Sequence, residues 1–161
     1  MKKEKILFIC SGNTCRSVMA QALFQKLKDE IDSDLPFQAY SAGTRTLNGT
    51  SSPREAVFAM AKRGLDISKH QARQVAAKIM KDSLLVLTMT NQQKIFLNTH
   101  FPEASRKIFL FRPYCYQANL IGDEEIEDPY GKGLSFYESL SYQLEQDITR
   151  LIHYLRKEKS R

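Results

Sequence analysis

One stretch near the start of the chain combines a cysteine, an arginine and a serine at a spacing that suits catalysis. The stretch from Cys10 to Ser17 reads Cys-Ser-Gly-Asn-Thr-Cys-Arg-Ser. A cysteine thiolate is a strong nucleophile, and the planar guanidinium of Arg16 can hold two phosphate oxygens at once. The Ser17 hydroxyl can donate to the Cys10 sulfur and stabilise it as a leaving group. Together these side chains favour phosphoryl transfer through a phosphorylated cysteine.

The elements on either side place this stretch where an anion binds. The apolar run 6–9 predicts a buried strand over 5–10, and apolar residues at every fourth position predict a helix over 16–31. Amides at the start of a helix have no intrahelical acceptor, and the helix dipole favours negative charge there. We therefore expect phosphate to bind in this loop. The residues expected to bind it are Ser11, Gly12, Asn13, Thr14, Cys15 and Ser17.

The backbone of the loop must curl so that its amides point inward. Gly12 and Asn13 tolerate the left-handed backbone angles that such a curl requires. A cysteine and an arginine six positions apart also occur by chance, and a cysteine at a strand end is often a small packing residue. The combination of strand, Gly-Asn loop, arginine, serine and helix favours the functional interpretation.

Strands and helices alternate along the rest of the chain. The expected strands are 5–10, 37–41, 84–87 and 108–111, and the expected helices are 16–31, 53–63, 69–80, 90–99 and one running from Phe136 to Leu155. Residues 42–52 are expected to form a loop and 112–135 a long polar connection. This order predicts an α/β fold, a four-stranded parallel sheet with helices on both faces. Because ligands of such sheets bind beyond the carboxyl ends of the strands, Cys10 and Ser41 fall on the functional edge.

Composition excludes several other classes of protein. The 161 residues predict one domain over 1–161, and 42% hydrophobic content is ordinary for a globular chain. The net charge of +6 comes from scattered basic residues, so we expect no nucleic-acid partner. Because the sequence shows no signal peptide and no long apolar run, we expect a cytoplasmic protein that binds no membrane. The odd count of three cysteines argues against a disulfide framework. We also expect a monomer.

Several motifs together resemble one known family. The loop is similar to the Cys-x5-Arg-Ser signature of the low-molecular-weight protein-tyrosine phosphatases. The stretches 41–44, 70–74 and 128–130 resemble later landmarks of that family in the same order, so the resemblance covers nearly the whole chain. Val18 departs from it, since the family usually has proline there. The resemblance implies a protein phosphatase that acts on phosphorylated proteins and needs no cofactor and no metal.

A general acid is needed to protonate the leaving group, and a base to activate water afterwards. The long connection carries Asp128-Pro129-Tyr130, which matches the family's Asp-Pro-aromatic acid, so the resemblance assigns both roles to Asp128. Tyr130 is expected to form a wall of the substrate pocket, with a half-exposed packing aromatic as the competing interpretation. The neighbouring carboxylates are expected to form a solvated acidic stretch; they are Asp123, Glu124, Glu125 and Glu127.

The resemblance also implies supporting residues. In the family the loop asparagine is held by a serine and a histidine, which correspond here to Ser41 and His70, beside Asn13. A surface or capping histidine is the alternative for His70. Cys15 matches a cysteine that traps the oxidised nucleophile as a disulfide, with a small packing residue as the alternative. We assign no role to Cys115.

The loop position held by Thr14 bears on the substrate. Tyrosine-directed members usually carry a larger apolar residue there, whereas bacterial protein-arginine phosphatases resemble this chain in reading Gly-Asn-Thr-Cys-Arg-Ser. Thr90 and Gly131 also differ from the residues usual in tyrosine-directed members. The resemblance therefore favours phosphoarginine, with phosphotyrosine as the alternative.

Two further classes remain as alternatives. An arsenate reductase uses a related loop but needs two further redox cysteines downstream, and this chain has only Cys115 there. A non-catalytic phosphoprotein-binding module would be expected to lack the nucleophile or the acid, yet Cys10, Arg16 and Asp128 are all present.

Overall fold

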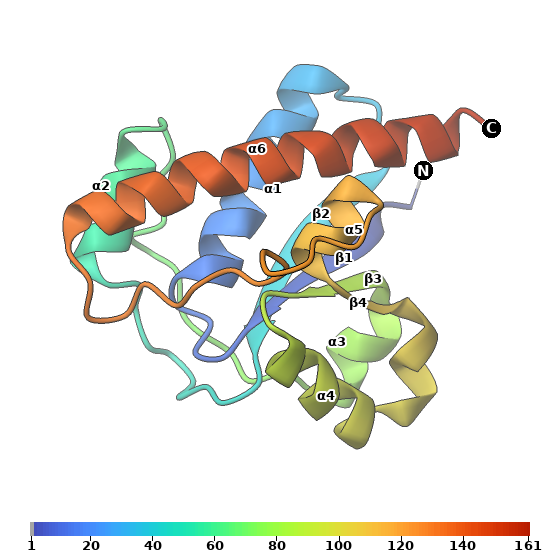
Figure 1. Ribbon diagram of the computed structural model, residues 1–161, viewed down its shortest axis with the longest axis horizontal. Helices are drawn as coiled ribbons and strands as arrows, with labels where there is room; N and C mark the ends of the chain where they lie inside the picture. Colours follow the sequence, from blue (N-terminus) through green and yellow to red (C-terminus); the bar gives the residue numbers. More distant parts are fainter. Residues whose placement is uncertain (1) are drawn as a thin grey trace.

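A parallel sheet lies at the centre of the molecule. The computed structural model describes residues 2–161. Within them four parallel strands form one sheet in the order β2-β1-β3-β4. The strands are β1 (Glu4–Cys10), β2 (Phe37–Gly43), β3 (Ser83–Thr88) and β4 (Ile108–Leu110). Helices pack on both of its faces, as Figure 1 shows, so the expected α/β architecture is confirmed.

The side chains of the central strand β1 point alternately to the two faces of the sheet, and a hydrophobic core covers each face. Ile6 and Phe8 belong to the larger hydrophobic core, and Leu7 and Ile9 belong to the smaller one. The larger core is closed by α1 (Arg16–Ile31), α2 (Arg54–Ala61), α5 (Phe111–Tyr116) and α6 (Leu134–Lys159). The smaller core is closed by α3 (Ala77–Asp82), α4 (Asn91–His100) and a short 3-10 helix over Pro102–Lys107.

The register of the strands gathers their carboxyl ends at one edge of the sheet. Cys10 pairs with Gly43, and Ile9 pairs with Thr88. A Cβ atom on Gly43 would overlap the Thr46 hydroxyl and the backbone oxygen of Ser11. Glycine is therefore needed at the end of β2 for the loop after β1 to pass so close.

The helix expected over 69–80 is wrong in its first part. The helix α3 covers only Ala77–Asp82, and the chain before it runs beside the end of β2. There the Gly43 amide donates to the Arg73 backbone oxygen at 2.9 Å, and the Val75 amide donates to the Gly43 backbone oxygen at 2.8 Å. These tertiary hydrogen bonds hold the backbone extended and override its local helical pattern.

The region after β4 also differs from expectation. The strand stops at Leu110, and Phe111 already begins α5, which occupies the start of the expected connection over 112–135. The helix expected over 53–63 is shorter, with Pro53 at its N-cap. Across residues 2–161, no helix combines the length and the apolar character needed to cross a lipid bilayer.

Candidate active site

The loop after β1 exposes the start of α1 to a ligand. β1 ends at Cys10, α1 begins at Arg16, and Cys15 occupies the N-cap position. The Cys15 side chain makes no capping hydrogen bond within the described residues, so the first amides of α1 keep their donors for an anion.

The Cys10 sulfur is buried and faces two hydrogen-bond donors. Ser17 Oγ lies 3.0 Å from Cys10 Sγ, and the Asn13 amide donates to the same sulfur at 3.3 Å. Asn13 Nδ2 in turn donates to Ser17 Oγ at 2.9 Å, which leaves the Ser17 hydroxyl proton for the sulfur. Both groups can therefore donate to the Cys10 sulfur.

Asn13 is the residue that fixes the shape of the loop. Its φ of 54° is left-handed, whereas Gly12 is not among the positive-φ residues in the part of the chain described. The Asn13 side-chain oxygen accepts from the Arg73 amide at 3.0 Å. His70 Nε2 lies 2.8 Å from the Asn13 backbone oxygen. Burial lowers the pKa of His70, so at neutral pH its uncharged ring donates Nε2–H to that oxygen.

Ser41 takes a different place from the one expected. Its hydroxyl donates to Gln21 Oε1 at 2.6 Å rather than to Asn13. Its backbone oxygen accepts from Arg73 Nε at 2.9 Å. Arg73 therefore connects β2 to the loop, through its side chain to Ser41 and through its amide to Asn13. Sequence reasoning missed this role because a backbone amide leaves no residue-type signal.

Arg16 joins the loop to residues 123–128, which we call the Asp128 segment. The guanidinium is buried, and its Nη1 donates to the Ile126 backbone oxygen at 3.0 Å. Its Nη2 lies 3.7 Å from Asp128 Oδ2, while the Asp128 side chain is 58% exposed. Ile126 is itself fixed, because its amide donates to the Met89 backbone oxygen at the end of β3 at 3.0 Å. The structure thus brings Arg16 and Asp128 together at the sheet edge.

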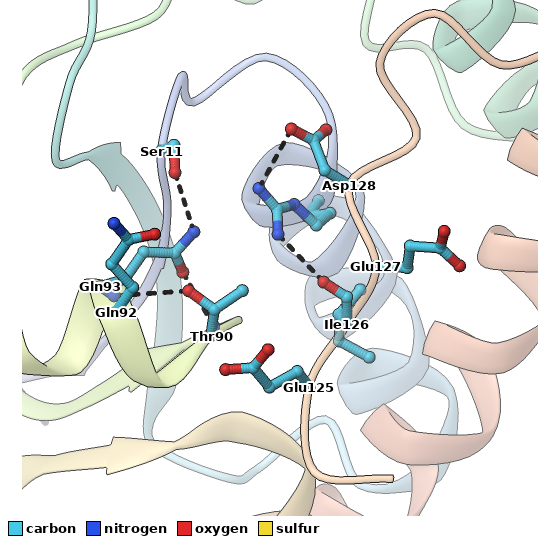
Figure 2. Close-up of a pocket in the computed structure, with 9 residues that line it drawn as sticks. Ser11, Thr90, Gln92, Gln93, Glu125, Ile126, Glu127 and Asp128 are labelled. Carbon is cyan, nitrogen blue, oxygen red and sulfur yellow. Dashed lines mark hydrogen bonds and ion pairs between the residues drawn. The ribbon is translucent and has the colours of Figure 1, made fainter. Parts of the chain in front are cut away.

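A pocket of about 420 Å³ opens between the loop, the start of α4 and the Asp128 segment (Figure 2). It is lined by Ser11, Arg16, Thr90, Gln92, Gln93, Glu125, Ile126, Glu127 and Asp128. Of the residues expected at the site, Ser11, Arg16 and Asp128 line this pocket, whereas Tyr130, Cys10 and the other residues of the loop, Thr14 included, do not. Tyr130 is 83% exposed, and its amide donates to Asp128 Oδ1 at 3.1 Å. Thr14 Oγ1 lies 3.6 Å from Cys15 Sγ.

Gln93 connects the pocket wall to the loop and was not foreseen. Its Nε2 donates to Ser11 Oγ at 3.1 Å, and its Oε1 accepts from the Met89 and Thr90 amides. Thr90 and Gln93 form a capping box at the start of α4. The spacing Thr-x-x-Gln is a recognisable signal for a helix start and could have indicated this residue.

Glu125 is exposed, as expected for a solvated acidic stretch, and it also makes a contact that was not foreseen. Its Oε1 accepts from the Asn91 amide at 2.7 Å, at the positive end of α4, and Figure 2 shows it beside Thr90 in the pocket. Glu127, by contrast, pairs with Lys132 at 2.5 Å. One carboxylate of the stretch therefore joins the Asp128 segment to α4.

The two remaining thiols are buried. Cys15 Sγ lies 3.7 Å from the Tyr137 hydroxyl, and burial raises the pKa of the Cys15 thiol. Burial likewise raises the pKa of the Cys115 thiol. All three cysteines are free. Within residues 2–161, no group of three or more His, Cys, Asp or Glu side chains is placed to hold a metal ion.

Known proteins that are similar to this chain in sequence or in fold include phosphatases. The chain is 31% identical to a protein-arginine-phosphatase of Bacillus subtilis over 96% of this chain and 98% of that protein. It is 28% identical to the low molecular weight protein-tyrosine-phosphatase Wzb of Salmonella typhi, over 98% of each chain. The solved YwlE arginine phosphatase from Geobacillus stearothermophilus superposes with a TM-score of 0.85 at 30% identity, covering 97% of this chain and 95% of its own.

The family model described as "low molecular weight phosphotyrosine protein phosphatase" matches residues 5–161, so the chain belongs to this family.

Proposed function

We propose that this protein removes phosphate from phosphorylated protein side chains through a phosphocysteine intermediate, with phosphoarginine as its preferred substrate. The observation that carries the mechanism is the Cys10 sulfur, held by Ser17 Oγ at 3.0 Å and by the Asn13 amide at 3.3 Å. Arg16 serves as the phosphate-binding cation, and Asp128, whose Oδ2 lies 3.7 Å from Arg16 Nη2, serves as the acid.

In the first step, the Cys10 thiolate attacks the phosphorus atom and a sulfur–phosphorus bond forms. The bond from phosphorus to the substrate nitrogen or oxygen breaks, and Asp128 gives its proton to that leaving atom. The first amides of α1 and the Arg16 guanidinium stabilise the charge that spreads over the phosphoryl oxygens.

In the second step, Asp128 acts as a base because it is now ionised. It takes a proton from a water molecule whose oxygen attacks the phosphorus, and the sulfur–phosphorus bond breaks to release inorganic phosphate. The Cys10 thiolate leaves with the electron pair of that bond. The Ser17 hydroxyl and the Asn13 amide stabilise it as it leaves.

The charge of the pocket supports the preference for phosphoarginine. Its lining holds three carboxylates, from Glu125, Glu127 and Asp128, against the single cation of Arg16. A phosphorylated guanidinium is positively charged next to its phosphoryl group, and a cleft lined by negative charge attracts such a group. The uncharged phenol ring of phosphotyrosine gains nothing from these carboxylates. The arginine phosphatases among the relatives support the same choice.

The experiment is paired hydrolysis of a phosphoarginine protein and a phosphotyrosine peptide by the wild type, Thr14→Ile and Thr14→Val. The Val variant is the matched control, since it removes the hydroxyl and keeps the branched shape. We expect the wild type to prefer phosphoarginine and Thr14→Ile to shift the ratio towards phosphotyrosine. Better hydrolysis of phosphotyrosine by the wild type would instead assign the chain to tyrosine-directed phosphatases. Failure to hydrolyse either substrate would refute the proposal.

A further inference from the structure

A buried ion pair lies where α5 meets α6. Arg112 Nε donates to Asp147 Oδ2 at 3.1 Å. Both side chains are buried: that of Arg112 is 9% exposed and that of Asp147 is 1% exposed. The other carboxylate oxygen, Asp147 Oδ1, is buried with no hydrogen-bond partner among the described residues. An unpaired buried carboxylate costs free energy, so Asp147 needs the Arg112 cation beside it. The ion pair therefore holds the Arg112 guanidinium in one position.

The rest of the Arg112 guanidinium faces the chain that leads to the active site. Its Nη1 donates to the Asp123 backbone oxygen at 2.8 Å and lies 2.6 Å from Asp123 Oδ1. The guanidinium also stacks over the Tyr116 ring, 5.6 Å from its centroid. One buried side chain therefore holds both the backbone and the carboxylate of Asp123.

Asp123 marks where an exposed loop becomes a fixed segment. Before it, Gln117 and Gly122 have left-handed φ values, and Ile121 is 96% exposed. After it, the chain is held at Glu125 by α4 and at Ile126 by Arg16 and by the end of β3. The segment ends at Asp128, five residues beyond Asp123. The contact with Arg112 is thus the first of a series of attachments that lead to the acid.

We propose that Arg112, fixed by Asp147, is a positioning residue that sets the placement of Asp128 through Asp123. The inference rests on the proposed function, because it requires Asp128 to be the general acid. Arg112 acts only through the segment and touches no substrate. Its loss is expected to impair proton donation to the leaving group and to leave the attack by Cys10 intact.

The test compares aryl phosphates whose leaving groups range from good to poor. Arg112→Met/Asp147→Leu replaces the buried pair by apolar side chains of similar size, an exchange that folded proteins often tolerate. Since a general acid contributes about 10²- to 10⁴-fold, we expect roughly a ten-fold loss of kcat/KM with the poorest leaving groups. With nitrophenolate as leaving group, we expect a change of less than about two-fold, because little protonation is needed.

A second arginine that pairs with a carboxylate of α6 provides the matched control. Arg63 pairs with Glu145, donates to Ser141 Oγ and lies over the Tyr142 ring. All three of these residues belong to α6 and none to the Asp128 segment. Arg63→Met/Glu145→Leu should therefore leave the leaving-group dependence unchanged. Asp123→Ala, at a side chain 71% exposed, is the variant for the case in which the buried double substitution does not fold. It should shift the dependence in the same direction by a smaller factor.

Repeating the substitutions in an Asp128→Asn background separates positioning from general destabilisation. If Arg112 acts through Asp128, its loss adds nothing in that background. An equal loss for all leaving groups, or the same loss without Asp128, would overturn the inference while the proposed function stands. A wild type that hydrolyses neither an aryl phosphate nor a phosphoarginine protein would instead overturn the proposed function itself.

Discussion

Arg16 Nη2 lies 3.7 Å from Asp128 Oδ2, so the proposed phosphate-binding cation and the proposed acid form an ion pair in the lining of the pocket. Arg16 Nη1 is meanwhile tied to the Ile126 backbone oxygen. A bound phosphoryl group must share the guanidinium with the Asp128 carboxylate. The ion pair therefore couples anion binding to the Asp128 carboxylate.

Asp128→Asn should have opposite effects on binding and turnover. Removing a carboxylate beside the anion site should tighten inhibition by inorganic phosphate by about two- to five-fold, the scale of an exposed ion pair. Turnover of substrates with poor leaving groups should fall by about 10²-fold or more, because the proton donor is gone. Inhibition constants and kcat/KM for two aryl phosphates would measure both. Unchanged turnover with both substrates would place the acid elsewhere.

Ser17→Ala should slow the reaction without abolishing it. The hydroxyl lies 3.0 Å from the Cys10 sulfur, and a hydrogen bond to a charged group contributes about 1.5–3 kcal/mol, or roughly 10- to 100-fold in rate. Because the sulfur is the leaving group in the second step, phosphoenzyme should accumulate in rapid-quench experiments. Cys10→Ser gives the baseline, since it should remove turnover altogether. A Ser17→Ala enzyme with wild-type rates would argue against this contact.

Gly43→Ala should distort the loop after β1 from a position outside the pocket. The added methyl group would overlap the Thr46 hydroxyl and the Ser11 backbone oxygen, and such overpacking costs about 1–3 kcal/mol. We expect lower thermal stability together with weaker phosphate binding. Gly133→Ala is the control, because no atom lies within 4 Å of a Cβ built there. Equal melting temperatures for the two variants would contradict the close approach.

His70 should make stability depend on pH in the mildly acidic range. Burial lowers its pKa in the folded chain, so the folded state binds fewer protons than the unfolded state, whose histidine pKa is about 6.5. Stability should therefore fall as the pH drops below about 6.5 towards the folded pKa, and His70 should contribute no pH dependence above both values. Urea unfolding across this range should show a flatter profile for His70→Gln. The exposed His153 supplies the control substitution, His153→Gln, which should keep the wild-type profile.

The sheet, and the loop that carries the candidate reacting residues, could be predicted from the sequence. The apolar runs and the helical periodicity predicted four strands and the helix α1, because burial on both faces of a parallel strand requires continuous apolar residues. Cys10, Arg16 and Ser17 lie within eight residues of chain, so local spacing already indicated that they would share one loop.

The contacts that hold that loop and Asp128 in place could not be predicted in this way. The contacts from Arg73 to Asn13, from Glu125 to α4 and from Arg112 to Asp123 join residues far apart in sequence or use backbone atoms. The same cause explains the error over 69–76, where hydrogen bonds to Gly43 replaced a local helix. Such contacts depend on which segments the folded sheet brings side by side. The order of residue types along the chain does not indicate which segments those are.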